Sequence, residues 1–424
     1  MSQTTLMVIS SAIFIIAYIF IIIDKIDRTV TALLGACLMV AARVISQQQA
    51  FLKIDYNTLV LLIGMMIIVM ITKRTGVFEY LAIKTIKFAK AEPWKILFFL
   101  AVITGLISSL LDNVTTILLV LPVTVTVAKD LKLNPIPFTI AEVFASNIGG
   151  TATLIGDPPN IMIGSSAGLS FMDFVKNLTL PVMLILLVTS YIFVLIYRKK
   201  LNTSAEARRR VMAMDEKSAI KNPALLKKSL VVIALTILGF VLHGYLGYES
   251  STVAFSGAAA LLLISGEKVG RVLEEVEWKT ILFFAGLFVM VGGLEAAGII
   301  DMIARWLMSA THGDPALTMI AVLWGSAIAS AFIDNIPFVA TMIPLIKGLG
   351  AMSGMALGPI WWALSLGACF GGNGTIIGAS ANVVASGMMD EEHKISFAAY
   401  FKVAFPMMLL SVVLSMGYLL IFYR

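Results

Sequence analysis

Charged residues are scarce in this sequence. Asp, Glu, Lys and Arg make up 13% of the 424 residues, and 59% of the residues are hydrophobic, whereas a soluble globular protein has roughly 25% charged residues. Apolar runs of about 18 residues or more, the length of a bilayer-spanning helix, recur along the chain. The composition therefore excludes a soluble protein and predicts an all-α polytopic membrane protein.

Cysteines and catalytic motifs are also few or absent. The two cysteines, Cys37 and Cys369, lie in apolar surroundings, so neither a disulfide framework nor a thiolate metal site is expected. No G-x-x-x-x-G-K-[ST] motif, nucleophile–base set or metal-ligand spacing occurs. We therefore expect no cofactor, no metal and no enzymatic activity of the chain itself. The first apolar run, 6–23, has no small-residue cleavage site and is expected to stay as a membrane helix.

The net charge of +6 comes from one segment near the middle of the chain. Between Arg198 and Lys228 there are ten Lys or Arg residues and three acidic residues. Because Lys and Arg accumulate in cytoplasmic loops, 198–228 is predicted to be a basic cytoplasmic linker, and nucleic-acid binding is excluded. The protein would then be a multi-pass protein of the bacterial inner (cell) membrane.

A shift of 222 residues aligns the first half of the chain with the second. The stretch NIGGTATLIGDPPN, which begins at Asn147, matches CFGGNGTIIGASAN, and DNVTTILLVLP, which begins at Asp112, matches DNIPFVATMIP. Matches at one ungapped offset over so many polar and glycine positions indicate two copies of one unit. The copies are predicted to occupy 1–197 and 229–424.

Each copy is expected to contain about five transmembrane helices, a re-entrant hairpin and a broken helix. Scaffold helices occupy 1–75, and the hairpin and broken helix lie within 96–168 and again within 316–390. The hairpin arms, at about 15 residues, are short for a membrane span. An odd number of crossings would turn the second copy upside down. The six Lys or Arg residues in 73–95, against one in 295–317, agree with two inverted repeats.

The interruptions of the helices are predicted to form a binding site. Backbone leaves a helix at membrane depth only where protein or a water-filled cavity satisfies its polar groups, and paired interruptions in two repeats meet near the midplane in transporters. Gly149, Gly150, Gly371 and Gly372 would let the backbone approach a substrate closely. Taken singly, however, a glycine in a membrane helix more often serves packing.

Four carboxyl groups lie in apolar surroundings, those of Asp112, Glu142, Asp157 and Asp334. A charge at the bilayer centre costs at least about 2.5–3.5 kcal/mol, so such residues are expected to be functional, and all four are candidates for carrying protons. Asp112 and Asp334, at the two hairpin tips, would serve equally well as helix caps, whereas Glu142 lies mid-helix. Asp157 aligns with Ala379, so the two half-sites are expected to differ.

The stretches NIGGTATLIGDPPN, DNVTT, DNIPFVATMIP and NGTIIGASANVV resemble the arsenite efflux permease and pink-eyed-dilution protein family of the ion transporter superfamily. The resemblance covers essentially the whole chain. It implies ten transmembrane helices, two re-entrant hairpins and a scaffold domain beside a mobile transport domain. The substrate-binding residues that it implies are Asp112, Asn113, Thr115, Thr116, Asn147, Thr151, Thr153 and Asn160 in the first copy and Asp334, Asn335, Asn373, Thr375 and Asn382 in the second.

The same resemblance implies a secondary transporter that exports arsenite or antimonite in exchange for protons, alone or as the membrane subunit of an arsenite-stimulated ATPase. A homodimer is common in the superfamily. Arsenous acid is largely neutral at pH 7, and Asn, Thr and Asp side chains suit its hydroxyls.

Two alternatives stay open at this point. A sodium/proton antiporter would use the Asp-Asn tips and exposed carbonyls for a hard cation. A sodium-coupled organic-anion transporter has less support, because no intramembrane arginine is apparent to match a carboxylate.

Overall fold

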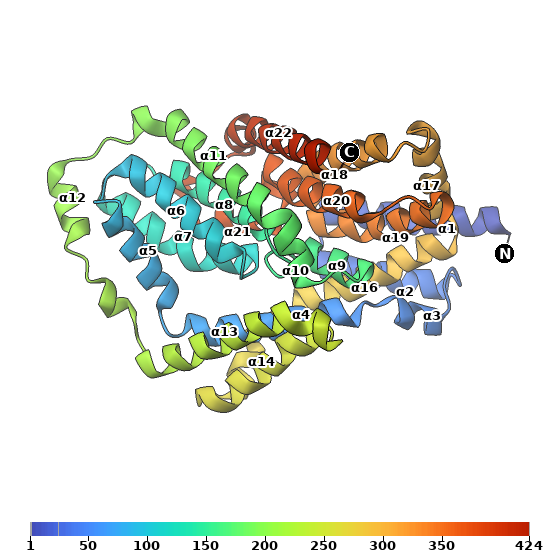
Figure 1. Cartoon of the computed structure of the whole chain (residues 1–424), viewed down its shortest axis with the longest axis horizontal. Helices are drawn as coiled ribbons and strands as arrows, with labels where there is room; N and C mark the ends of the chain where they lie inside the picture. The colour runs from blue at the N-terminus through green and yellow to red at the C-terminus, as the bar shows by residue number, and fades with distance from the viewer. Residues whose placement is uncertain (1, 24, 424) are drawn as a thin grey trace.

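The computed structural model describes residues 2–23 and 25–423, and this part of the chain consists of helices and their connections, without a strand (Figure 1). The helices of the first half are α1 (Gln3–Ile23), α2 (Arg28–Ala41), α3 (Gln47–Lys53), α4 (Tyr56–Lys73), α5 (Val77–Phe88), α6 (Pro93–Ser108), α7 (Asn113–Asp130), α8 (Ile136–Gly150), α9 (Pro158–Ala167), α10 (Phe171–Phe174), the π-helix η1 (Val175–Thr179) and α11 (Leu180–Tyr197).

The predicted linker contains η2 (Arg198–Lys200), α12 (Ala205–Met212) and η3 (Glu216–Ala219). The second half contains α13 (Pro223–Leu246), α14 (Ser250–Ser265), α15 (Val269–Glu274), α16 (Trp278–Ala296), α17 (Ile299–Ala310), α18 (Pro315–Phe332), α19 (Asn335–Ser353), α20 (Gly358–Gly371), η4 (Gly372–Gly374), η5 (Ile376–Gly378), α21 (Ser380–Gly387), η6 (Glu391–His393) and α22 (Phe397–Phe422). The last six residues assigned to the linker thus belong to α13. That helix begins early because the Asn222 side chain caps it, accepting from Leu225 N, and Pro223 fits its first turn.

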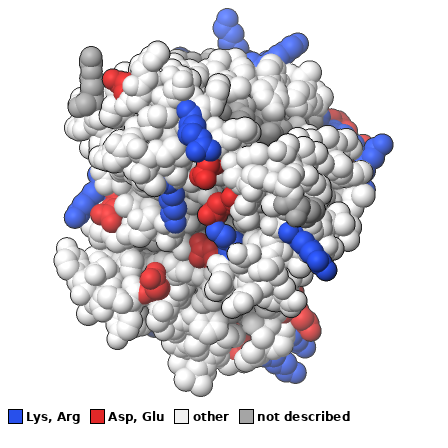
Figure 2. Space-filling view, turned by 90° about the vertical axis from the view of Figure 1, so that its right-hand side faces the viewer, with Lys and Arg blue, Asp and Glu red and all other residues white. Residues whose placement is uncertain are grey.

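The helices of the two halves correspond at the 222-residue offset. The pairs α2 and α14, α4 and α16, α6 and α18, α7 and α19, α8 and α20, and α9 and α21 each begin 222 residues apart. In Figure 1, α5 lies at the same end of the molecule as α12, whereas its equivalent α17 lies at the end that holds the N-terminus. Figure 2 shows that this second end carries basic and acidic side chains interspersed, without a patch of one sign. The opposite placement of α5 and α17 agrees with inverted repeats.

Nine helices in the described part of the chain are long and apolar enough to cross a membrane, by length and composition. Three of them, α7, α18 and α19, are arms of the predicted hairpins and have 18, 18 and 19 residues, and the fourth arm, α6, has 16. The arms are therefore longer than predicted, since α7 continues through Pro122 and α19 through Pro344.

Packing across the halves produces two bundles. In the first, which we call the paired bundle, α4 packs on α14 and α2 on α16, with α1 and α13 beside them. In the second, the hairpin bundle, α6 packs on α8 and α18 on α20, flanked by α11 and α22, while α7 packs on α21 and α19 on α9. Because α4–α14, α2–α16, α7–α21 and α19–α9 all join one half to the other, the core is shared between the repeats.

Close helix crossings in the paired bundle depend on two equivalent glycines. A Cβ atom at Gly64 of α4 would lie 2.7 Å from the carbonyl carbon of Ala254, and one at Gly286 of α16 would lie 2.7 Å from that of Ala32. Such distances are too short for any larger residue, so these glycines set the spacing of α4–α14 and α2–α16.

Candidate functional site

The hairpin tips are closed by the two predicted aspartates. Asp112 Oδ1 accepts a hydrogen bond from Thr115 N at 2.9 Å, and Asp334 Oδ1 accepts one from Ile336 N at 3.1 Å. Each carboxylate thus caps the helix that follows it. The capping role is seen at both tips, and it leaves the second carboxylate oxygen of each free for other partners.

Asparagine side chains form hydrogen bonds with the backbone carbonyls that are left without helical partners at the breaks. Helix α8 ends at Gly150 and α9 begins at Pro158, and Asn160 Nδ2 donates to the carbonyls of Thr151 and Thr153 at 3.0 and 2.9 Å. Its equivalent Asn382 donates to two carbonyls of the second break at 2.7 and 2.8 Å. The breaks are therefore held by side chains of their own repeat, as a backbone interruption at membrane depth requires.

Threonines connect each break to the neighbouring hairpin tip. Thr153 Oγ donates to the Ser109 carbonyl, and the equivalent Thr375 Oγ donates to the Ala331 carbonyl, both at 2.5 Å. Thr151 Oγ donates to the Asn147 carbonyl at 2.9 Å. These hydroxyls are buried and tied to backbone, so the structure places them in the framework of the site.

Four asparagines, Asn113, Asn147, Asn373 and Asn382, form a cluster that we call the asparagine clamp. Asn147 Nδ2 donates to Asn373 Oδ1 at 2.9 Å and to Asn382 Oδ1 at 2.8 Å, and its Oδ1 accepts from Asn113 Nδ2 at 2.9 Å. All four side chains are buried. The clamp joins α7 and α8 of one half to the broken helix of the other.

The four glycines predicted to approach a substrate instead allow close approach of backbone. A Cβ atom at Gly149 would overlap Gly105 of α6, and one at Gly371 would overlap Ala327 of α18. Gly150 lies in the same way against Gly156 across the first break, and Gly372 lies against Gly378 across the second. The structure thus favours the packing interpretation for these glycines.

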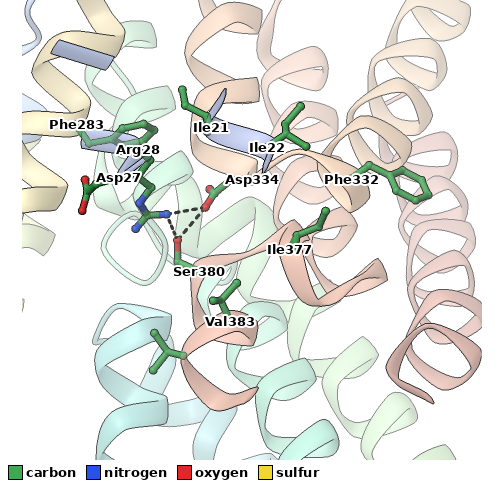
Figure 3. Close-up of a pocket in the computed structure, with 11 residues that line it drawn as sticks. Ile21, Ile22, Asp27, Arg28, Phe283, Phe332, Asp334, Ile377, Ser380 and Val383 are labelled. Atoms are coloured by element: carbon green, nitrogen blue, oxygen red, sulfur yellow. Dashed lines mark hydrogen bonds and ion pairs between the residues drawn. The ribbon is translucent and has the colours of Figure 1, made fainter. Parts of the chain in front are cut away.

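Two adjoining cavities lie between the hairpin tips, the breaks and the paired bundle. The first has a volume of about 230 Å³ and contains Asp27, Arg28, Phe283, Asp334 and Ser380 in its wall (Figure 3). The second, of about 170 Å³, shares Arg28 and Ser380 with the first. Its other polar lining residues are Asp112, Asn113, Asp157, Glu277, Thr280 and Asn335.

The predicted site residues therefore separate into two groups. Five of them line these two cavities: Asp112, Asn113, Asp157, Asp334 and Asn335. The others are Thr115, Thr116, Glu142, Asn147, Thr151, Thr153, Asn160, Asn373, Thr375 and Asn382, and they lie in the buried framework outside both linings.

Arg28 is a cavity residue that the sequence analysis missed. Its Nη1 lies 3.1 Å from Asp334 Oδ2 and donates to Ser380 Oγ at 2.7 Å, and Ser380 Oγ donates to Asp334 Oδ2 at 2.8 Å (Figure 3). The guanidinium also lies over the Phe283 ring, 5.4 Å from its centroid. No intramembrane arginine was expected to match the carboxylate of a solute. Arg28 reaches the cavity because it begins α2, and there it pairs with Asp334 of the protein itself.

Asp157 and Glu142 each have one oxygen without a hydrogen-bond partner among the described residues, Asp157 Oδ1 and Glu142 Oε2. The other oxygen of Asp157 accepts from Asn335 Nδ2 at 3.4 Å, and that of Glu142 accepts from Thr124 Oγ at 2.6 Å. A partnerless carboxyl oxygen offers a place to hold a proton. Of these two residues, Asp157 lines the second cavity and Glu142 lines neither cavity.

The remaining acid of the first cavity, Asp27, is held in its charged form. Hydrogen bonds from Thr29 N and from Lys279 lower the pKa of Asp27 below its ordinary value. No group of three or more His, Cys, Asp or Glu residues with metal-binding geometry occurs in residues 2–23 and 25–423.

Paired hairpins and broken helices around buried carboxyls, in a chain of long apolar helices, define the class of multi-pass membrane transporters. Within this class, the family model described as "Citrate transporter" (CitMHS) matches residues 18–367. The chain belongs to this family.

Curated relatives agree with this assignment. An uncharacterized transporter of Mycobacterium tuberculosis is 45% identical over 387 residues, covering 90% of each chain. The mouse P protein is 34% identical over 500 residues, covering 97% of this chain and 60% of the P protein. The predicted relation to pink-eyed-dilution proteins is thereby confirmed.

A solved structure shows a similar fold. The YdaH transporter of Alcanivorax borkumensis superposes with a TM-score of 0.57 at 14% identity, over 88% of this chain and 86% of that one.

Proposed function

We propose that the protein is a secondary transporter that exports arsenite or antimonite in exchange for protons. The solute binds in the two cavities between the hairpin tips and the breaks, and the bundles move relative to each other to expose it on alternate sides of the membrane. The linker lies in the cytoplasm, and the membrane is the bacterial inner membrane.

The charge of the cavity lining is the observation that carries this proposal. Asp112, Asp157 and Glu277 line the second cavity, while Arg28, the one arginine among the described residues of the two linings, is already paired with Asp334. A polyanion would meet this acidic lining without a free counter-charge. Arsenous acid needs none, because its three neutral hydroxyls suit the amides and hydroxyls of Asn113, Asn335, Thr280 and Ser380.

Asp157 is the coupling residue in this proposal. It lines the second cavity, and one of its oxygens has no hydrogen-bond partner in the part of the chain that the structure describes. Binding of a solute beside it and binding of a proton to it then compete for the same space, which is the requirement for exchange of one for the other.

Two other cargoes, citrate and sodium, fit the lining less well. The family description names citrate, and Arg28 would suit a carboxylate, but it is occupied by Asp334 and the lining carries more acids than bases. A sodium ion would suit the same acids and the carbonyls of the breaks. Sodium/proton antiport is therefore the second candidate.

Transport measurements on purified protein in liposomes with an imposed pH gradient distinguish arsenite, sodium and citrate as the cargo. Arsenite accumulation driven by the gradient, with no response to sodium or citrate, supports the proposal. Dissipation of the pH gradient by sodium alone would establish sodium/proton antiport. Citrate movement driven by the gradient would establish citrate transport. Because the liposomes contain no ATPase, arsenite transport in them also excludes the need for an ATPase partner.

A further inference from the structure

The two bundles touch each other unequally in the two halves. Helix α9 packs on α4 at their interface, and α10 packs on α13. In the other half of this described structure, α21 lacks a comparable contact with α16, which packs on α19 of the hairpin bundle instead. The first cavity fills that place instead, since Phe283 of α16 faces Ser380 and Val383 of α21 across it.

Polar side chains hold the closed contact. Ser165 Oγ, near the end of α9, donates to Asp55 Oδ1 at the start of α4 at 2.9 Å. Asn57 Nδ2 donates to Ser165 Oγ at 3.1 Å and to Glu249 Oε2 at 3.2 Å. Ser165 is thus the residue of α9 that binds both Asp55 and Asn57.

The equivalent positions in the open half lack these contacts, and there Arg28 of α2 joins the two bundles through Asp334 and Ser380 instead. A shift of 222 residues takes Asp55, Asn57, Ser165 and Glu249 to Glu277, Lys279, Gly387 and Asp27. The contact within the paired bundle recurs, because Lys279 Nζ lies 3.2 Å from Asp27 Oδ2. Gly387 has no side chain to offer, and a Cβ atom there would meet nothing within 4 Å.

We propose that Asp55, Asn57 and Ser165 form a latch that holds α9 on α4 in the state described here, and that transport breaks this contact while closing α21 onto α16. The inference rests on the proposed alternating-access function and assigns its two states to named contacts. Because Gly387 has no side chain to form the contact that Ser165 makes, the same latch cannot hold α21 on α16, and the protein rests with the α16–α21 side open.

Two matched cysteine pairs test the latch. Asn57→Cys with Ser165→Cys probes the closed contact, and Lys279→Cys with Gly387→Cys probes its open equivalent; none of the four positions lines either cavity. A short, reducible bis-thiol reagent should cross-link the first pair at rest and stop transport until the link is reduced. The second pair should react slowly at rest and faster during turnover. Each single-cysteine variant controls for reaction through the exposed Cys37.

Ser165→Ala in the Lys279→Cys/Gly387→Cys background gives an independent measurement. Losing the two hydrogen bonds of the Ser165 hydroxyl should speed cross-linking of that pair at rest by roughly fivefold or more. The neighbouring Ser166→Ala is the control and should leave the rate unchanged.

Equal resting rates for the two pairs, or no effect of Ser165→Ala, would overturn the latch. The cross-linking rates at rest are measured without solute. A failure of arsenite transport would therefore refute arsenite as the cargo, while the cross-linking rates would still test the latch.

Discussion

Asn147 makes three hydrogen bonds to asparagines of three other segments, and its side chain is fully buried. Replacing it with alanine leaves the amide of Asn113 and the carbonyl oxygens of Asn373 and Asn382 short of a partner. Each unpaired buried group costs about 1–3 kcal/mol. We predict that Asn147→Ala lowers the apparent melting temperature in detergent by several degrees, whereas Asn202→Ala on the exposed linker does not. A variant that melts like the native protein while losing solute affinity would instead make Asn147 a binding residue.

Asp157 and Glu142, each with one oxygen that has no partner among the described residues, differ in what surrounds them, and this difference is testable. Asp157 lines a cavity, whereas Glu142 is bonded to Thr124 within the hairpin bundle. We predict that Asp157→Asn abolishes gradient-driven accumulation but retains solute exchange without a gradient, since the amide keeps the shape and cannot carry a proton. Glu142→Gln should keep coupled transport. Loss of coupling in Glu142→Gln alone, measured in the same liposomes, would transfer the role to Glu142.

At the scale of helices, the crossings of α8 on α6 and of α20 on α18 are set by equivalent glycines. A Cβ atom at Gly149 or Gly371 would overlap backbone of the neighbouring helix, and overpacking of this kind costs about 1–3 kcal/mol. We predict that Gly149→Ala and Gly371→Ala each reduce the fraction of protein that elutes as a single species in detergent. Gly325→Ala on α18 is the matched control, because nothing lies within 4 Å of its added Cβ atom. Equal behaviour of all three variants would contradict this packing role.

The sequence predicted the elements well where polar signals recur in both repeats. The stretch 1–75, expected to hold scaffold helices, contains α1 to α4, and the stretch 96–168, expected to hold a hairpin and a broken helix, contains most of α6 together with α7, α8 and α9. Which of the predicted site residues line the cavities and which form the buried framework was harder to predict. Asn147 and Asp157 both look functional in sequence. Only the three-dimensional packing shows that the Asn147 side chain is hydrogen-bonded to other asparagines, whereas the Asp157 side chain lines a cavity.

Arg28 and Ser165 were missed for a related reason. Arg28 follows a turn, where a charge is ordinarily solvated, and Ser165 lies in a run of small residues that suggests helix packing. Their roles depend on which helix of the other bundle reaches them. A polar residue matched by a different residue at the 222-residue offset, as Arg28 is by Ser250 and Ser165 by Gly387, is the signal that would have directed attention to them.

At the scale of the whole molecule, the packing pattern decides how the protein can fold. The contacts α4–α14, α2–α16, α7–α21 and α19–α9 all join the two halves. Linker element η3 packs on α5, and the Lys221 backbone N–H donates to the Thr75 carbonyl at 2.9 Å, so the linker belongs with the first half. A break after Lys221 keeps these contacts and leaves the Asn222 cap on α13.

We therefore predict that residues 1–221 and 222–424 are each unstable when expressed alone and assemble into a functional transporter when expressed together. Each half alone would expose the apolar faces of helices that the other half covers. A tag on one fragment should recover both in equal amounts, with transport restored to the level of the uncut chain. If one fragment purified alone as a stable, monodisperse protein, it would have a complete hydrophobic core without the other half. The inference of a core shared between the repeats would then be wrong.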